Sequence, residues 1–522
     1  MSAWLGIDAS TQSVTALLVD DSGRTLREET VNFGRDLPAY GAPQGFVEGG
    51  APGEVHADPL MWLDALDLCL GRMRAAGCDF SAVSGISGAG QQHGTVYLGR
   101  GWTDALARLE PARGLSSGIA PALTRKTAPI WMDVSTGAEC AEIADAVGGP
   151  SEVCRRSGSV AIERFSGPQI RRFHKTDPES YRRTARIHLV SSFFASILAG
   201  TDAPVDHGDG TGMNLLDLET LEWDPALLEA TAPDLRDKLP APAPSATVIG
   251  PVSPYFQFKY GFQPTAKVVA FTGDNPSSLI GMGAASPGTA VVSLGTSDTF
   301  FAALPRPTFD PNGYGHVFGN PLGGFMALAC FRNGSLAREA LRDELGVDWA
   351  AFGEEGLSRT PPGNDGNGMV PFFGPEITPR VNLGKPLRFG SEAFRTNPSA
   401  GQLIRACLEG QFINVRRETR WIGIEPEVIL LTGGASRNDG IAQTLADVMG
   451  APVDRLAASG SVAIGAVIRA AKALGGSADA IERKLSSVVP GSRRVPREGL
   501  AEVYSDLEKR FGAALDSFLR DR

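Results

Sequence analysis

Residues 290–304 read AVVSLGTSDTFFAAL, and the chain opens on a similar pattern at residues 3–19, AWLGIDASTQSVTALLV. Each stretch has an apolar run, a short turn rich in Gly, Ser and Thr, and a second apolar run, which predicts two strands joined by a turn. The two stretches lie about 290 residues apart in a chain of 522 residues. A single hydrophobic core stops growing at about 250–300 residues. The repeat therefore predicts two similar domains, which we place at residues 1–286 and 287–522.

Strand and helix patterns alternate along the chain, which favours an α/β fold. We expect helices at 59–76 and 398–422, short buried strands at 83–86, 268–271 and 428–431, a Gly-rich loop at 88–94, and a surface helix over the last ~25 residues. The proline-rich stretch 239–245 (LPAPAPS) predicts an exposed connection.

The composition is that of an ordinary globular chain and narrows the choice of partners. Hydrophobic residues make up 42% and the net charge is −10, which argues against nucleic acid or an anionic membrane as the main partner. No apolar stretch reaches the ~18–20 residues of a membrane span, and the start of the chain lacks the basic segment of a signal peptide. Six scattered cysteines without a CxxC pair suit a reducing cytosol, so we expect a cytoplasmic protein.

Three turns rich in Gly, Ser and Thr follow predicted buried strands, at residues 8–13, 294–299 and 432–438. Such turns present backbone N–H groups and hydroxyls to an anion, although a single one is usually only a connection. The chain has no GxxxxGK[ST] motif, no GxGxxG after a strand, and no protein-kinase HRD or DFG element. It also has no HExxH pattern for a metal held by the protein alone. The turns are therefore candidates for phosphate binding of a different kind.

Two aspartates lie next to predicted strand ends or turns and are candidates for catalysis or metal binding. Asp274 follows the strand pattern in VVAFTGDNPSS (268–278), and ligands of open α/β sheets bind outside the carboxyl ends of strands. A carboxylate there can take a proton from a hydroxyl, or it can simply begin a helix as its N-cap. Asp8 opens the first turn, where it either acts through Mg²⁺ beside a phosphate or bonds its own backbone.

Taken in order, these segments resemble the FGGY carbohydrate kinases of the actin-like ATPase superfamily, and most closely the animal-type xylulokinase branch. The similar segments are ISGAGQQHG (86–94), IWMD (130–133), ERFSGPQI (163–170), FTGDNPSSL (271–279), SLGTSDT (293–299) and TGGAS (432–436). The resemblance runs from residue 3 to about 470. It implies two ribonuclease-H-like α/β domains on either side of a catalytic cleft, with sugar bound mainly by residues 1–286 and ATP mainly by residues 287–522.

The resemblance also implies residue roles. Asp274 matches the general base, and the metal-linked carboxylate is Asp8. The sugar-contacting residues would be His93, Gln92, Arg164, Asp274 and Asn275. The ATP-binding residues would be Thr11, Gln12, Ser13, Gly295, Thr296, Ser297, Trp349, Gly434, Ala435 and Asn438.

Three of these residues have simpler interpretations that the sequence leaves open. His93 in a Gly-rich loop could be a structural turn residue. Arg164 could be half of a surface ion pair with Glu163 or Asp177. Trp349 could be a core anchor.

The chain also departs from the family pattern. The first turn has Ser10 where many members have Gly, and its hydroxyl could donate in place of close backbone approach. Gln169 and Phe173 replace a lysine and a tryptophan that are usual in the family, as in the animal-type branch.

The resemblance implies transfer of the γ-phosphoryl group from Mg·ATP to a ketopentose, with the 5-hydroxyl of D-xylulose as the leading acceptor. Two alternatives stay open: a kinase for another ketose or polyol, and a sugar-responsive actin-like binding protein without useful transfer. We expect a monomer or a homodimer.

Overall fold

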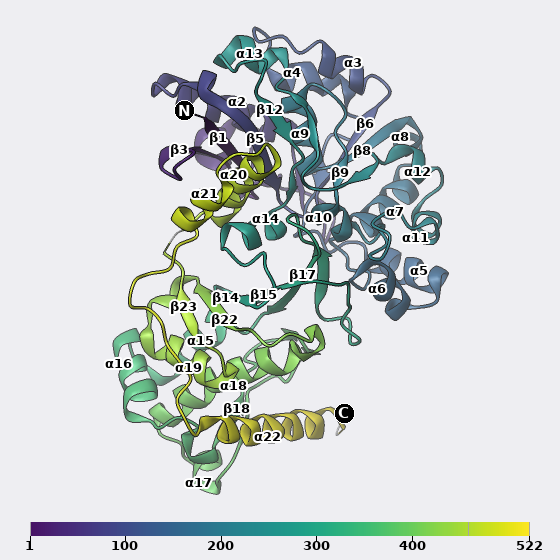
Figure 1. Ribbon diagram of the computed structural model, residues 1–522. Helices are drawn as coiled ribbons and strands as arrows, with labels where there is room; N and C mark the ends of the chain where they lie inside the picture. Colours follow the sequence, from purple (N-terminus) through teal and green to yellow (C-terminus); the bar gives the residue numbers. More distant parts are fainter. Residues whose placement is uncertain (1, 458, 521–522) are drawn as a thin grey trace.

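The computed structural model describes residues 2–457 and 459–520 and has two α/β lobes (Figure 1). The N-terminal lobe surrounds the sheet that contains β1 (Ala3–Ala9), and the C-terminal lobe surrounds the sheet that contains β14 (Thr289–Leu294). Figure 1 shows the first lobe at the top in purple to teal and the second at the bottom, mostly in green. The fold class predicted from the sequence is confirmed.

The N-terminal sheet has the order β11-β12-β5-β1-β2-β3, with β13 pairing further along β5. Its central strand β1 pairs antiparallel with β2 and parallel with β5. The central strands are buried on both faces, as expected where other elements cover both sides of a sheet. The other strands are β2 (Ser13–Asp20), β3 (Thr25–Asn32), β5 (Val83–Gly90), β11 (Val248–Pro251), β12 (Lys267–Val269) and β13 (Thr272–Gly273).

The C-terminal sheet has the order β16-β17-β15-β14-β22-β23 and repeats this arrangement. Its central strand β14 pairs antiparallel with β15 and parallel with β22. In both lobes, therefore, the turn after the central strand and the carboxyl end of its parallel neighbour (β5 or β22) lie at the same end of the sheet's strands. The other strands are β15 (Asp298–Leu304), β16 (His316–Gly319), β17 (Phe325–Phe331), β22 (Val428–Thr432) and β23 (Val453–Arg455).

Long helices cover the sheets and begin where the sequence supplies caps. In α2 (Pro59–Ala75) the Asp58 carboxylate accepts the N–H of Leu60, and proline stands at the first helical position. In α18 (Ala400–Glu418) Ser399 and Gln402 form a capping box. Further helices of the C-terminal lobe are α15 (Ser335–Leu345), α16 (Trp349–Gly353), α19 (Asp439–Met449) and α22 (Leu500–Arg520). No helix in residues 2–457 and 459–520 combines the length and the apolar character that crossing a membrane requires.

Late in the sequence the chain returns to the N-terminal lobe. The helices α20 (Ser461–Ala473) and α21 (Ala478–Leu485), yellow-green in Figure 1, lie beside the purple strands of the first sheet. They bury a cluster that includes Trp4, Leu17 and Val19 of that sheet. The axis of α20 crosses α14 (Asp274–Gly281) closely, because a Cβ on Gly465 would come within 1.9 Å of the Ser277 carbonyl oxygen.

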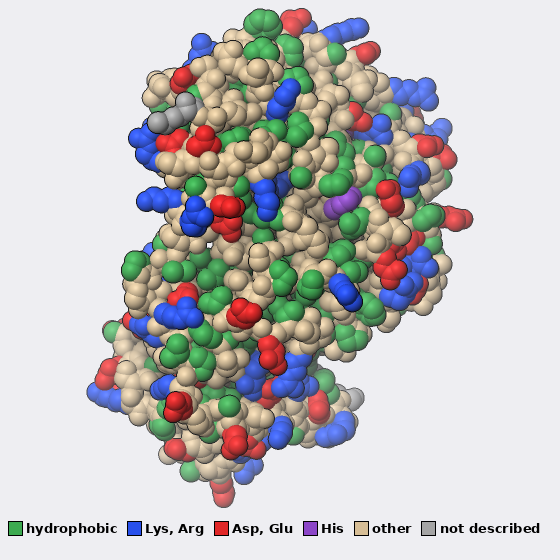
Figure 2. Space-filling view, in the orientation of Figure 1, with side chains coloured by type: hydrophobic (Ala, Val, Ile, Leu, Met, Phe, Trp, Pro, Cys, Tyr) green, Lys and Arg blue, Asp and Glu red, His purple; other side chains and the backbone are tan. Residues whose placement is uncertain are grey.

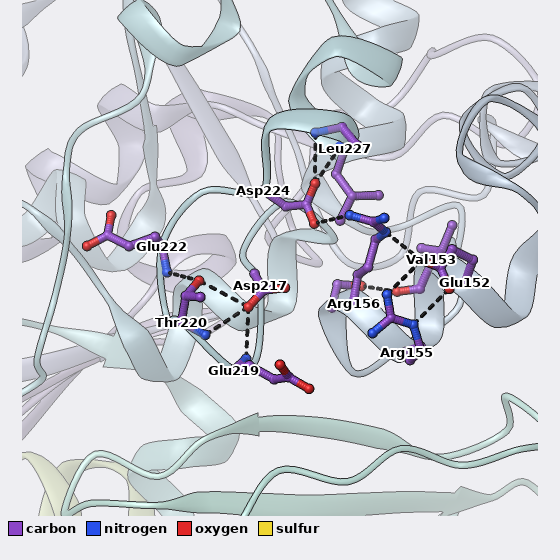
Figure 3. Close-up of polar contacts among 12 residues, drawn as sticks. Glu152, Val153, Arg155, Arg156, Asp217, Glu219, Thr220, Glu222, Asp224 and Leu227 are labelled. Carbon is purple, nitrogen blue, oxygen red and sulfur yellow. Dashed lines mark hydrogen bonds and ion pairs between the residues drawn. The ribbon is translucent and has the colours of Figure 1, made fainter.

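A helical layer on the right of Figure 1 extends the N-terminal lobe. It includes α5 (Gly137–Val147), α6 (Pro150–Ser157), α7 (Ser166–Thr176), α11 (Pro225–Thr231) and α12 (Leu235–Lys238). Figure 3 shows how Arg156 of α6 joins two of these helices: its Nη1 donates to the Asp224 carboxylate at 2.9 Å, and its Nε donates to Glu152 at 2.8 Å. Asp224 also caps α11 by accepting the N–H of Leu227, so one carboxylate fixes both the start of α11 and its place against α6.

Two segments differ from the expectation. The stretch predicted as a loop at 88–94 begins as strand, because β5 runs on to Gly90 and pairs there with Ala9 and Gly273. The proline-rich stretch 239–245 is not an exposed connection throughout: Leu239 and Ser245 are buried, and its short strand β10 (Pro242–Ala243) pairs with β9 (Val205–Asp206). Alternating prolines leave every second backbone N–H in place, which permits this short pairing.

Candidate active site

Two carboxylates lie at the carboxyl ends of the parallel strands in the N-terminal sheet, on either side of the end of β5. Asp8 is in register with Ala89 of β5, and Gly273 is in register with Gly90 on the other side. Asp274 follows Gly273 directly as the first residue of α14. The parallel pairing of β1, β5 and β13 therefore brings together two acids that are 266 positions apart in the sequence, from 8 to 274.

Only one oxygen of the Asp274 carboxylate accepts hydrogen bonds from other residues of the described chain. Its Oδ1 accepts from the backbone N–H of Asn275 at 2.8 Å, from Asn275 Nδ2 at 3.1 Å and from the N–H of Gln92 at 3.4 Å. No other residue in the described part of the chain donates a hydrogen bond to Oδ2. Burial raises the pKa of Asp274 to about 6, against the lowering effect of these hydrogen bonds. One oxygen is thus held in place while the other is available to a proton.

Asp8 is a partly exposed acid with one buried oxygen. Its Oδ1 is buried and makes no hydrogen bond with any described residue. Burial, and then the charge of Asp274, raise the pKa of Asp8 to about 7. A buried carboxylate without a donor is expensive unless a cation balances it. The site therefore fits a divalent metal, which keeps several waters and needs few protein ligands.

No group of three or more His, Cys, Asp or Glu residues in the described chain is arranged to hold a metal ion by itself. A metal at Asp8 would accordingly be shared with the phosphates of a nucleotide, as in phosphoryl-transfer sites generally.

The amides of Gln92 and Asn275 join in one hydrogen-bonded row with Asp274. Asn275 Nδ2 donates to Gln92 Oε1 at 3.0 Å, and the same nitrogen donates to Asp274. Glycines enclose the Gln92 side chain: a Cβ on Gly273 would lie 2.6 Å from it, and a Cβ on Gly212 would lie 3.1 Å from its Nε2. The side chain is therefore confined between two backbone segments.

His93 and Arg164 belong to an aromatic group that both lobes supply. The His93 ring packs on Phe165 with centroids 4.0 Å apart, and Phe165 also contacts His316 of β16. Burial lowers the pKa of His93 well below its usual value, so the ring is neutral, and its Nδ1 has no partner in the described chain. Arg164 Nη2 approaches His316 Nε2 at 3.5 Å.

The ion pair that the sequence left open for Arg164 is absent. No described acid lies within ion-pair distance of its guanidinium, and Asp177 instead caps α8 (Pro178–Arg183) by accepting the N–H of Ser180. His93 thus presents an unpaired ring nitrogen and Arg164 a guanidinium without an acid partner among the described residues, as hydroxyl-binding residues would.

The side chains of the first turn form hydrogen bonds both within the turn and to neighbouring segments. The Ser10 hydroxyl bonds the carbonyl and the hydroxyl of Ser13, each at 3.0 Å, so its bonds lie within the turn. The hydroxyl of Thr11 accepts from the indole N–H of Trp131 at 2.8 Å. The exposed side chain of Gln12 donates to Gln44. Trp131, nearly half exposed, was not predicted as a site residue; its place in the IWMD segment was the only signal.

The second turn, Gly295–Ser297, is anchored at its base. Asp298 directly after it is buried and forms two hydrogen bonds of 2.9 Å with Arg338 of α15. The Gly295 carbonyl accepts the N–H of Ser335 at the start of the same helix. This buried pair was also not predicted, because Arg338 lies 40 residues further along the chain.

Four residues predicted to bind ATP line a single cavity of about 480 Å³ on the C-terminal lobe. They are Trp349, Gly434, Ala435 and Asn438, and the cavity also contacts Arg338 and Phe352. The Trp349 side chain is 47% exposed, so it is not a core anchor, and its ring meets Phe352 edge to face. An exposed indole beside a Gly-rich segment suits the flat face of a base.

A second cavity, of about 360 Å³, lies between the lobes. Asn275 and Ser278 of α14 line one side, and Ser293, Thr432 and Gly433 of the second sheet line the other. Asn275 and the strand end that precedes Gly434 therefore face a common space. No described hydrogen bond joins the first turn to the second, so these two turns are brought to the same region without direct contact.

The geometry defines a class of protein. Two repeated α/β lobes, each with a turn and a strand end at one sheet edge, enclose paired carboxylates and a cavity for a base, which is the arrangement of an actin-like phosphotransferase. The comparisons give the family. The N-terminal and C-terminal domain models of the FGGY family of carbohydrate kinases match residues 125–281 and 290–474. The chain belongs to this family.

Individual relatives extend the match over the whole chain. The chain is 43% identical to the mouse xylulose kinase, covering 98% of this chain and 93% of that protein. It is 38% identical to xylulose kinase 2 of Arabidopsis thaliana, over 90% of this chain and 87% of that one. The crystal structure of xylulose kinase from Rhodospirillum rubrum superposes with a TM-score of 0.82 at 21% identity, covering 99% of both chains, and supports the fold. Members of this family are ATP-dependent phosphotransferases with an alcohol acceptor that work with a divalent metal.

Proposed function

We propose that this protein phosphorylates D-xylulose at its 5-hydroxyl with Mg·ATP, giving D-xylulose 5-phosphate. The observation that carries the proposal is Asp274, a partly buried carboxylate at a strand end whose Oδ2 is free beside the amides of Gln92 and Asn275. The similarity to xylulose kinases over almost the full length supports D-xylulose as the acceptor.

The proposed mechanism depends on position and charge. Asp274 Oδ2 accepts the proton of the attacking hydroxyl, and the hydrogen bonds to Oδ1 hold the carboxylate in place. Magnesium bound at Asp8 would neutralise charge on the nucleotide phosphates. The turns at Thr11–Ser13 and Gly295–Ser297 supply N–H groups and hydroxyls to those phosphates. Arg164, His93 and Asn275 orient the sugar, with Gln92 holding Asn275.

We further propose that residues 1–286 bind mainly the sugar and residues 287–522 bind mainly ATP, with closure of the lobes excluding water. The six cysteines are all free, which supports a cytoplasmic location. Charges of both signs are interspersed on the face in Figure 2, which supports small molecules rather than a nucleic acid or a membrane as partners. A monomer or a homodimer remains the expected assembly.

The test is a coupled ATPase assay with D-xylulose, D-ribulose, glycerol and L-fuculose, with product analysis for the phosphorylated carbon. We expect D-xylulose to give the highest kcat/KM. Glycerol should be far poorer because it lacks most of the hydroxyls that the site binds, and such losses reach about 10⁴-fold in sites that hydrogen-bond their substrates. A higher kcat/KM for another sugar would identify a different acceptor. Sugar binding without transfer would favour the alternative of a binding protein.

A further inference from the structure

A buried acid that has no part in the mechanism above lies behind the amides of Gln92 and Asn275. Asp209 belongs to the short helix α10 (His207–Gly210) and is 1% exposed. Its Oδ2 accepts from the Ser191 hydroxyl of α9 (Val190–Ala199) at 2.5 Å, and its Oδ1 accepts from Gln92 Nε2 at 3.3 Å. Among the described residues, Asp209 contacts Asn275 and Asp274 only through Gln92.

These contacts fix the direction of a row of hydrogen bonds. With the Ser191 hydroxyl donating to Oδ2 and Gln92 Nε2 donating to Oδ1, Asp209 accepts at both oxygens. Gln92 must then turn its Nε2 toward Asp209 and its Oε1 toward Asn275. Asn275 in turn must offer Nδ2 to Gln92 Oε1. An amide side chain is symmetric in shape, so only such partners decide which end is oxygen.

The consequence appears at the sugar side. Because Asn275 Nδ2 is committed to Gln92 and Asp274, its Oδ1 is left without a donor in the described chain. Asp274 Oδ2 is left without a donor as well. The site therefore presents two acceptors side by side, which suits hydroxyl groups that give up or share their hydrogens.

We propose that Asp209 is a positioning residue that sets the amide directions of Gln92 and Asn275 and so makes this part of the sugar site hydrogen-bond accepting. The inference rests on the proposed function. It assigns to Asp209 a role in sugar affinity and in the orientation of Asn275, without contact with the substrate.

The packing around Gln92 favours this orientation of its amide. The glycines at 212 and 273 leave Gln92 no room to swing aside. A Cβ on Gly208 would lie 2.3 Å from the Thr272 hydroxyl, so α10 itself sits against the strand that leads to Asp274. A reversed amide would have to form in the same place, with two N–H groups or two oxygens opposed.

The test is a double-mutant cycle on the full-length protein, with KM for D-xylulose and for ATP measured separately. Asp209→Asn keeps an oxygen toward Gln92 and can give its amide N–H to Ser191, so we expect less than about a tenfold loss in kcat/KM. Gln92→Glu places two carboxylates against each other and should lower kcat/KM for sugar by about 10²-fold. Adding Asp209→Asn to Gln92→Glu restores a donor opposite the new carboxylate. The double variant should therefore be at least about ten times more active than Gln92→Glu alone.

Two further variants separate the effect of amide orientation on sugar binding from a general loss of folding. Asp209→Ala removes the acceptor and should raise KM for D-xylulose about ten- to a hundredfold while KM for ATP changes less than about twofold. Ser191→Ala removes a hydrogen bond from the other oxygen of the same carboxyl and should leave the sugar KM within about threefold of wild type.

The outcomes distinguish the inference from the proposed function. A double variant no better than Gln92→Glu, or an Asp209→Ala defect shared equally by sugar and ATP, overturns the role of Asp209 in a wild-type enzyme that still phosphorylates D-xylulose. A wild-type protein that uses another sugar overturns only the proposed acceptor, and the cycle is then run with that sugar. A wild-type protein that transfers phosphate to no sugar overturns both.

Discussion

At the scale of single residues, the free oxygen of Asp274 is the feature on which the proposed transfer depends. Asp274→Asn keeps the size of the side chain and can keep the bonds to Oδ1, but it removes the proton acceptor. We expect kcat to fall by about 10²–10⁴-fold, as is typical when a general base is lost. The measurement is kcat with saturating sugar and ATP, with circular dichroism as the control for folding. Turnover close to wild type in the folded variant would show that another group takes the proton.

The environment of Asp274 also predicts a pH dependence. The base works only when ionised, and burial raises its pKa to about 6. As the pH falls through that value the protonated, inactive form grows, so kcat/KM should drop about tenfold per pH unit on the acid side. Asp8 faces the same space with its pKa raised to about 7, so the two acids will titrate as a pair. A kcat/KM that stays flat from pH 7 down to about 4.5 would contradict the raised pKa.

Asp8 is expected to act on the nucleotide side alone. Asp8→Ala should raise the Mg²⁺ concentration needed for half-maximal rate, because it removes a carboxylate whose buried Oδ1 has no hydrogen-bond partner among the described residues and suits a metal. Sugar affinity measured by calorimetry should change little. If instead sugar binding collapsed and the Mg²⁺ requirement stayed the same, Asp8 would belong to the sugar site.

Sequence patterns reached some of these residues and not others, for a physical reason. Asp8 and Asp274 follow strand patterns directly, so the rule that strand ends carry ligands was enough to select them. Asp209 acts through Gln92, which is 117 residues away, and Arg338 acts through Asp298. A hydrogen bond between distant segments leaves no periodicity in the sequence, and only the folded structure shows it.

At the scale of elements, the crossing of α14 and α20 positions Asp274, the proposed general base. A Cβ on Gly465 would lie 1.9 Å from the Ser277 carbonyl, which is backbone and cannot turn away. Gly465→Ala should therefore push the helices apart and cost about 1–3 kcal/mol of stability, together with a lower kcat because α14 begins at Asp274.

The matched control for that crossing is Gly71→Ala, the same substitution in the middle of α2. A Cβ on Gly71 would meet nothing within 4 Å, so the change should be neutral or stabilising by up to about 1 kcal/mol. The comparison uses thermal unfolding followed by circular dichroism. Equal melting temperatures for Gly465→Ala and Gly71→Ala would show that the crossing is not tight.

At the scale of the whole molecule, the sequence predicted the repeated fold but not the return of the late helices α20 and α21 to the first sheet. The similarity of residues 3–19 and 290–304 indicated two like sheets, because a central strand and its hairpin are local in sequence. The return of α20 to the first sheet was not predicted. An apolar helix face shows that a helix packs on something, but it does not say on which of two similar sheets.

This return means that the sugar-binding half is not expected to fold alone. A chain of residues 1–286 lacks α20 and α21, so Trp4, Leu17 and Val19, which are 0–5% exposed in the whole protein, would face water. Large exposed apolar patches favour association rather than a stable monomer. We expect residues 1–286 to aggregate or to unfold without a cooperative transition. A version with residues 461–485 joined through a flexible linker should unfold cooperatively, because it restores the helices that cover this face. Size-exclusion chromatography and thermal melts compare the two, and a monomeric, cooperatively melting 1–286 fragment would show that the N-terminal lobe is complete without the returning helices.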